Sequence, residues 1–287
     1  QRYTARLNVD QRIGANLSLS FRTFYSRGVQ DGFTNDGAGN IFFRLTRQSA
    51  AVDLLKRDTL GRLMIRSNIM NQGDQNQNPL LWTSGNGYTD MRVDDRFIGG
   101  GTMRWSPVSW ADLEANFSYD RAGYRYKQFQ NKGFRTQGVA WLGYQGFLEY
   151  NPYGNENFNT SLNLTLRLTI GRNLATRFPF RYLYEQQDTY SADEWGSVLA
   201  VVGVDAAINA TTSQNIRSSR TSTRLVGLFA GANLEYKERY IADVLIRRDG
   251  SSLFGSQNRW ATFGRASVAY RLSQESWWPF RDALNEF

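Results

Sequence analysis

The sequence contains no cysteine and no histidine. Without cysteine the chain has no disulfide, no thiolate metal ligand and no thiol nucleophile. Without histidine it has no imidazole ligand, no histidine base and no serine–histidine triad. These two absences exclude many familiar metal sites and hydrolytic active sites.

Long apolar runs are also missing. No stretch approaches the roughly 18 to 20 apolar residues that a membrane-spanning helix requires, and the mean hydropathy is −0.53. Aromatic residues are nevertheless abundant, because 15 Tyr, 18 Phe and 8 Trp make up 14% of the 287 residues. A transmembrane β-barrel combines both properties, since its lumen is polar and aromatic girdles lie at both membrane interfaces.

The net charge of +8 arises from 34 Lys and Arg against 26 Asp and Glu. A block of cations would suggest a nucleic-acid or acidic partner. Here the cations are instead spread along the chain at strand spacing. We therefore expect a cationic lumen and solvated loops, and no nucleic-acid partner.

Apolar and polar residues alternate along much of the chain, which is typical of strands with one apolar face. From 162 to 170 every second residue is Leu or Ile, and the residues between them are Asn, Thr and Arg. Between 239 and 272 the alternation is interrupted by a polar loop, which predicts a long antiparallel hairpin. Nine strands are expected, at 3–10, 17–23, 96–105, 111–120, 162–170, 174–190, 224–236, 240–247 and 260–272, and a tenth is expected to start at Ala283.

The expected connections alternate strictly between short and long. Strands of about 9 to 11 residues cross a bilayer, and outer-membrane barrels pair short periplasmic turns with long extracellular loops. The pattern predicts an all-β fold, a segment of an antiparallel transmembrane β-barrel. Because both ends of the chain lack a closing pattern, we expect nine or ten strands of a larger barrel. Short turns are predicted near residues 15, 108, 172 and 238, and long loops over 30–93, 130–157, 188–220 and 249–259, with a short helix at 50–57.

In lipid, unpaired backbone groups are costly, so the sheet must close and its apolar face must point outward. We expect a kink or bulge at Gly99-Gly100-Gly101 and a disturbed pairing at Pro179, which cannot donate to the ladder. The polar residues predicted to line the lumen are Arg6, Asp10, Arg22, Glu114, Asp120, Arg167, Arg247 and Arg271.

The loop of the last hairpin has a distinctive sequence. It resembles an RxDGSSxFG…NRW motif of the SusC/RagA family of TonB-dependent outer-membrane transporters, with Ala261 where glycine is common. The stretch Asn78-Pro79-Leu80 with Trp82 and the segment 50–57 resemble the family as well, and the likeness spans essentially the whole chain. Either Arg247 or Arg248 supplies the arginine of the motif. The motif residues are Arg248, Asp249, Gly250, Ser251, Ser252, Phe254, Gly255, Asn258, Arg259 and Trp260.

The resemblance implies a barrel of about 22 strands with a plugged lumen, a SusD-like surface lipoprotein as partner, and energy supplied through TonB. It implies glycans or peptides as imported substrates and the cell outer membrane as location. Residues 1–287 are then expected to form part of the β-barrel domain, without the plug domain and the remaining strands.

Loop aromatics are the candidates for substrate contact, because their rings can stack on sugars or touch the lipoprotein. An interface girdle or simple loop packing is the alternative role. The motif loop is interpreted as structural, since Asp249 and Ser251 can bind nearby backbone and Gly250 permits a positive φ. The candidate aromatics are Trp82, Tyr88, Trp141, Tyr144 and Trp195.

No cofactor and no metal are expected. The acids Asp94-Asp95, and Asp188 with Asp193 and Glu194, have the oxygen ligands that Ca²⁺ prefers. Solvated loop acids are the simpler interpretation.

Catalysis is not expected either. Glu114 and Asp120 are an acid pair of the type that glycosidases use. Carboxylates beside arginines are, however, ordinary in a barrel lumen, so the chain is interpreted as a non-enzyme.

Two other function classes stay open from the residues alone. One is a passive porin or adhesin-like barrel without energy coupling, and the other is a secreted, carbohydrate-binding β-sandwich. The barrel requires the leucines of 162–170 to lie on an exposed, convex face, whereas a sandwich would bury them between two sheets.

Overall fold

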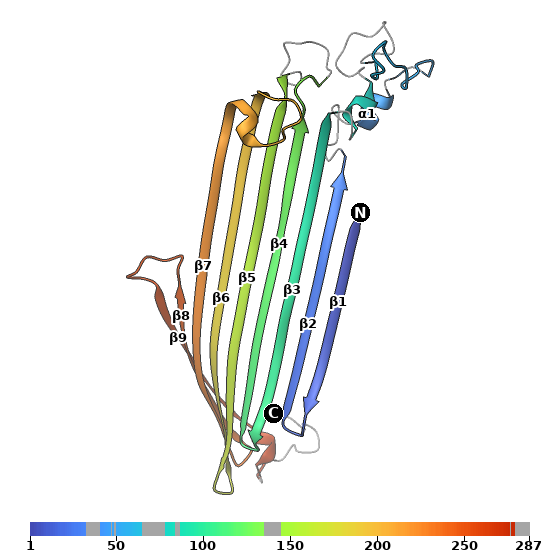
Figure 1. Ribbon diagram of the computed structural model, residues 1–287. Coiled ribbons are helices and arrows are strands. Elements are labelled where there is room, and N and C mark those ends of the chain that lie inside the picture. Colours follow the sequence, from blue (N-terminus) through green and yellow to red (C-terminus); the bar gives the residue numbers. More distant parts are fainter. Residues whose placement is uncertain are drawn as a thin grey trace.

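The computed structural model describes residues 1–32, 41–46, 48, 50–64, 78–83, 87–134, 145–275 and 277–278. Nine strands among these residues form one antiparallel sheet, in which each strand pairs with its neighbours in sequence (Figure 1). The sheet is open, with the first and last strands at its two edges. The strands are β1 (Arg2–Ile13), β2 (Leu17–Asp31), β3 (Tyr88–Val108), β4 (Ala111–Gln130), β5 (Phe147–Ile170), β6 (Leu174–Leu199), β7 (Ala210–Tyr236), β8 (Tyr240–Ser251) and β9 (Trp260–Tyr270).

The helices in the described part of the chain are few and short. They are α1 (Ile41–Thr46), η2 (Pro79–Trp82), η3 (Ala207–Asn209) and η4 (Leu272–Gln274). Among the described residues, no helix is long and apolar enough to span a bilayer.

The short turns gather at one end of the sheet and the longer connections at the other, as the sequence predicts (Figure 1). Tight reversals require backbone in the left-handed region, which glycine adopts without strain. Gly14 and Gly171 have φ of 63°, and at the β7–β8 turn Lys237 and Glu238 adopt φ of 53° and 58°. The four predicted short turns are confirmed.

Six strands, β2 to β7, are far longer than expected. The sequence predicts loops over 130–157 and 188–220, but β5 starts at Phe147, β6 continues to Leu199 and β7 starts at Ala210. At roughly 3.4 Å per residue, the 24 residues of β5 extend for about 80 Å. The apolar alternation ends sooner because it marks only the part of a strand that has lipid on one side.

The predicted helix at 50–57 is wrong. Aspartates in this segment bind backbone N–H groups ahead of them, which favours turns over helix. The Asp53 carboxylate accepts from the backbone N–H of Leu55 at 2.9 Å. The α-helix lies earlier, at Ile41–Thr46.

Asp58 organises the second half of the same segment. Its carboxylate accepts from the backbone N–H groups of Arg62 at 2.9 Å and of Leu60 at 3.0 Å. These N–H groups and the Arg62 guanidinium hold the pKa of Asp58 below its usual value. The result is a closed turn on the extracellular loop.

The apolar side of the sheet is exposed. In β5 the side chains of Leu162, Leu168 and Ile170 are 45%, 40% and 57% exposed. They lie on one face of a single sheet, with no second sheet packed on it among the described strands. This confirms the predicted lipid-facing surface and excludes the two-layer sandwich.

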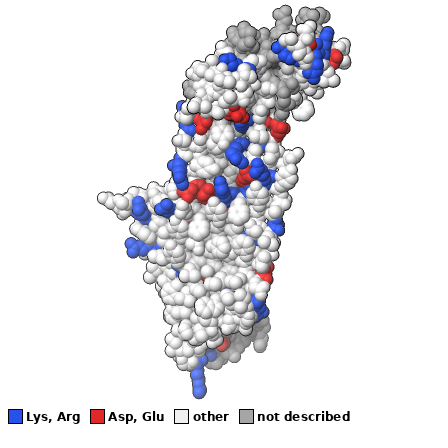
Figure 2. Space-filling model, in the orientation of Figure 1, with Lys and Arg blue, Asp and Glu red and all other residues white. Residues whose placement is uncertain are grey.

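The distribution of charge indicates which part of the sheet lies in the membrane. Figure 2 shows Lys, Arg, Asp and Glu gathered in the upper part of the visible face, and sparse over a continuous uncharged area below. Aromatic rings border that area. Those at the short-turn end include Trp105, Trp110, Tyr236, Tyr240 and Tyr270, and those at the upper border include Tyr25, Phe97 and Phe158.

Gly99-Gly100-Gly101 forms neither a kink nor a bulge, so this prediction is wrong. The pairing of β3 with β2 and β4 runs through all three glycines without a shift. Gly99 and Gly101 instead leave room for the rings of Phe97 and Phe117. A Cβ on Gly101 would lie 2.6 Å from Cε1 of Phe117.

Pro179 disturbs one of its two ladders, which confirms the expected effect. Thr165 of β5 still pairs with Pro179. On the other side, the β6–β7 pairing is interrupted between Arg177 and Phe180. The β5–β6 pairing continues past the gap, so β6 remains one strand.

Candidate functional site

The inner face of the sheet carries the polar side chains. Because side chains alternate along a strand, the register places one set of residues opposite the exposed leucines on all nine strands. The predicted lumen assignment is confirmed for Arg6, Asp10, Arg22, Glu114, Asp120, Arg167, Arg247 and Arg271.

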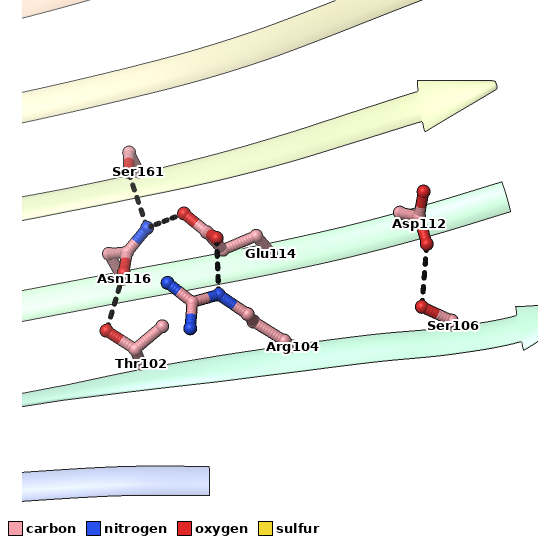
Figure 3. Close-up of polar contacts among 7 residues, drawn as sticks. All are labelled: Thr102, Arg104, Ser106, Asp112, Glu114, Asn116 and Ser161. Atoms are coloured by element: carbon pink, nitrogen blue, oxygen red, sulfur yellow. Dashed lines mark hydrogen bonds and ion pairs between the residues drawn. The ribbon is translucent and has the colours of Figure 1, made fainter. Parts of the chain in front are cut away.

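A connected polar network covers this face across β3, β4 and β5 (Figure 3). Arg104 Nε donates to Glu114 at 2.8 Å, and Asn116 Nδ2 donates to the other Glu114 oxygen at 2.8 Å. Thr102 Oγ1 donates to Asn116 at 2.7 Å, and Asn116 lies 3.5 Å from the Ser161 hydroxyl. The wall is therefore held rigid by side chains as well as by its backbone ladder.

Several acidic groups of this wall are already paired. Asp120 receives two hydrogen bonds from Arg96, the shorter at 2.9 Å. Asp112 accepts from Ser106 at 2.6 Å and forms an ion pair with Arg167. Both carboxylates are thus already bonded to neighbouring side chains, and the arrangement suits a polar channel wall.

The network forms the floor of a hollow of about 570 Å³. Small residues such as Gly100 and Ser118 form the bottom, while Arg22 on β2 and Arg181 on β6 flank it. Neither arginine makes an ion pair among the described residues. The hollow is water-accessible and fits a polar solute or a polar protein segment.

Two of the predicted loop aromatics are buried. Trp82 and Tyr88 are 7% and 2% exposed, and they pack with Phe134 in T-shaped and tilted arrangements. Leu63 and Leu81 complete this cluster. Both rings therefore have the packing role that the sequence left open, and little ring surface is available to a ligand.

Asn78 anchors this cluster. Its side chain is 1% exposed, donates to the carbonyls of Leu54 and Met64 at 2.8 and 3.2 Å, and accepts from Leu80 N–H at 3.0 Å. It thereby joins three segments of the extracellular insertion. The Asn-Pro-Leu resemblance in the sequence marks this structural anchor.

The remaining candidate aromatics are placed as follows. Trp195 lies in β6, not in a loop, and makes a T-shaped contact with Phe147, with ring centroids 5.5 Å apart. Trp141 and Tyr144 lie outside the described residues. A ligand contact by Trp195, Trp141 or Tyr144 stays a prediction.

The motif hairpin is held by backbone and side-chain bonds. Ser252 Oγ accepts from Arg224 N–H at 2.8 Å, and Ser251 Oγ accepts from Leu253 N–H at 3.3 Å. Asp249 pairs with Arg247 at 2.6 Å, a side-chain contact that replaces the expected backbone bond. The motif thus stabilises the joint between β7 and the β8–β9 hairpin.

Gly250 does not adopt the positive φ expected of it. It lies in β8 opposite Trp260. A Cβ at this position would lie 2.8 Å from Cε3 of the indole ring. Glycine is needed here because the tryptophan ring covers the backbone, and Arg248 lies 5.2 Å above the same ring.

The consecutive acids Asp94 and Asp95 point to opposite faces of β3, so they do not share one cation. Asp94 pairs with Arg92 at 3.0 Å on the inner face. Asp95 pairs with Arg125 at 3.2 Å on the outer face. Asp188 belongs to the second set of acids considered as calcium ligands. Its carboxylate accepts a hydrogen bond from the Gln186 side-chain amide.

Asn209 has a role that the sequence pattern does not reveal. Its side chain accepts from Val201 N–H at 2.8 Å and donates to the carbonyls of Val201 and Val204 at 2.8 and 2.7 Å. Replacing Asn209 with alanine removes all three hydrogen bonds, each of which contributes about 0.5 to 1.5 kcal/mol. Amide hydrogen exchange over 200–209 should rise at least tenfold, with exchange in β5 unchanged. Asn215→Ala, which removes a single side-chain bond to Asp193, is the matched control.

Comparison with known proteins finds TonB-dependent receptors of Formosa agariphila. One is 21% identical over 290 residues, which cover 100% of this chain and 28% of the receptor. A second is 22% identical over 283 residues, covering 96% of the chain and 27% of the receptor. The chain thus spans less than a third of the length of these relatives. No protein-family model matches it.

Solved structures show the same architecture. The RagAB peptide transporter superposes with a TM-score of 0.63 at 15% identity, over 96% of this chain and 31% of the transporter chain. The RagAB peptide importer in its closed-closed state gives 0.62 at 14% identity, over 96% and 30%. The fold is therefore an arc of an outer-membrane β-barrel, and the resemblance to TonB-dependent transporters is confirmed.

Proposed function

We propose that this chain forms part of the barrel wall of a TonB-dependent importer in the cell outer membrane. The observation that carries the proposal is the combination of a lipid-facing outer surface and a polar, ion-paired inner wall in a chain related to TonB-dependent receptors along its whole length. An exposed apolar band without spanning helices requires a closed barrel in the bilayer. Imported substrates are glycans, oligopeptides or similar nutrients.

The proposal gives the complete protein several partners. A plug domain fills the lumen and contacts TonB, the outer apolar band contacts lipid, and a SusD-like surface lipoprotein covers the extracellular end. Support comes from the polar hollow on the inner wall and from the extracellular loops, which fold into packed clusters around Trp82 and around Leu199. No catalytic step and no resident cofactor are part of this proposal.

Energy coupling separates this function from that of a passive porin. In cells that express the complete protein, uptake of labelled oligosaccharide or oligopeptide should fall at least tenfold when TonB is deleted or when a protonophore is added. Uptake through a general porin in the same cells is the control and should stay constant. Uptake that persists without TonB would assign the barrel to the passive class.

A further inference from the structure

A hollow opens on the outer face of the sheet, at the level where the aromatic border ends and charged side chains begin. This outer hollow has a volume of about 370 Å³ and lies between Arg121 and Arg125 of β4, with Asp95 of β3 on one side and Tyr190 of β6 on the other. We propose that it binds a phosphate group of a lipid in the outer leaflet of the membrane. The inference concerns the outer surface of the barrel and does not depend on what the lumen transports.

A pair of glycines gives the outer hollow its depth. Gly123 lies between Arg121 and Arg125 on the outer face of β4, so no side chain fills the space between the two arginines. Gly154 of β5 is paired with Gly123. The Tyr190 ring lies over Gly154, where its Cε1 atom would be 2.1 Å from an added Cβ, and it closes this side of the hollow.

The two arginines of the outer hollow keep hydrogen-bond donors for an anion. The side chains of Arg121 and Arg125 are 60% and 53% exposed. Arg121 lies 3.5 Å from Glu156, and Arg125 donates to Asp95 at 3.2 Å. A guanidinium carries several N–H donors in a planar fork, and this geometry matches a phosphate group. Both arginines can therefore bind a further anion while they keep their ion pairs.

Positive charge exceeds negative charge around the outer hollow. Asp95 is shared by two arginines, because Arg27 of β2 lies 3.9 Å from it in addition to Arg125. The other carboxylate is that of Glu156. Three arginines, Arg27, Arg121 and Arg125, thus share two carboxylates, and one positive charge stays in excess.

The other residues that line the outer hollow add no unbalanced charge. Arg96 lies between two outward residues of β3, so its side chain belongs to the inner face, where it donates two hydrogen bonds to Asp120. Ala122, Tyr124 and Tyr153 are likewise strand neighbours of Gly123 and Gly154. An anion in the hollow therefore meets mainly the outward arginines.

The position of the outer hollow favours a lipid over a free anion. One rim is formed by the rings of Tyr25 and Phe97, which are 41% and 39% exposed and belong to the upper aromatic border. Aromatic rings at a membrane interface lie at the level of the lipid headgroups. From this border to the short turns, the outward residues of the described strands β2 to β5 include no charged side chain. A lipid can place its acyl chains on that surface and its phosphate between Arg121 and Arg125.

The test measures lipid binding to the complete protein by native mass spectrometry in a non-ionic detergent. The probes are phosphorylated lipid A, the same lipid after its phosphate groups are removed, and inorganic phosphate. Phosphorylated lipid A should bind, and removal of its phosphates should weaken binding by at least about tenfold. The double variant Arg121→Gln, Arg125→Gln should weaken binding of the phosphorylated lipid about tenfold, which equals about 1.4 kcal/mol.

The double variant Arg92→Gln, Arg265→Gln is the matched control. Each of these arginines pairs with one aspartate, as Arg125 does, but both lie on the inner face and neither lines the outer hollow. Lipid does not enter the lumen, so the affinity for phosphorylated lipid A should stay within about twofold of the unmodified protein. An equal loss in this control would assign the effect to net charge and overturn the site.

The double variant Arg121→Lys, Arg125→Lys keeps both charges but lacks the planar fork, and it should lose affinity about threefold. Unchanged affinity in the glutamine variant would overturn the proposal. If the glutamine variant does not fold, unchanged affinity in the lysine variant would overturn it instead. Binding of the lipid without phosphate, or of inorganic phosphate, as tightly as phosphorylated lipid A would also contradict a lipid-phosphate site.

Discussion

Replacing Leu162 with arginine is expected to destabilise the complete barrel by about 2 to 4 kcal/mol, because the charge would lie near the middle of the bilayer. Leu162 is 45% exposed on the outer face, between Ala115 of β4 and Tyr182 of β6. No acidic side chain faces lipid at that height among the described residues. The measurement is reversible chemical unfolding in lipid vesicles.

Asn163→Arg is the matched control, since the next side chain along β5 points into the lumen. Position 163 pairs with Glu114 on β4 and Arg181 on β6, so an added guanidinium has a carboxylate and water beside it. We expect a change in unfolding free energy within about 1 kcal/mol, as for typical surface substitutions. Similar costs at both positions would contradict the assignment of the two faces.

Gly146→Ala is expected to produce the largest local effect at the extracellular end. Gly146 has φ of 88°, and a Cβ there would lie 2.6 Å from Cγ of Leu199, which is 1% exposed. The backbone strain costs about 1 to 2 kcal/mol, and displacing Leu199 from Phe129 and Leu148 adds about 1 to 3 kcal/mol. Hydrogen exchange over 146–149 and 197–200 should accelerate by at least about thirtyfold, since each 1.4 kcal/mol corresponds to a factor of about ten.

Gly133→Ala separates these two causes. Gly133 has a similar φ of 82°, but no atom lies within 4 Å of its added Cβ. Only the backbone strain of about 1 to 2 kcal/mol should be measured there. If both variants exchange equally fast, displacement of Leu199 contributes nothing to the destabilisation caused by Gly146→Ala.

The sequence predicts the membrane part of the sheet well, because lipid and water impose different side chains on its two faces. The alternation in 162–170 and the turn at Gly171 both reappear in the structure. Above the membrane, water lies on both faces, and the alternation fades. For that reason 147–157 and 188–199 look like loops in the sequence although they are paired strands.

The candidate functional site is less predictable from the sequence, because local residue patterns do not specify contacts between strands. Trp82 and Tyr88 look like exposed loop aromatics until the insertion folds around Asn78 and buries them. Tyr124 and Tyr153 are 29 positions apart and become a stacked pair only through the β4–β5 register. Their pairing depends on how many residues the connection between the strands contains.

The sequence by itself determined the strand faces, the short turns and the relation to outer-membrane transporters, because these depend on local spacing and on one motif. Only the tertiary structure decided how far the strands extend beyond the membrane, the roles of Gly101 and Gly250, and where the inner wall is hollowed. Each of these depends on which residue a neighbouring strand places alongside. Backbone pairing between strands sets the register, and local residue patterns do not encode this pairing.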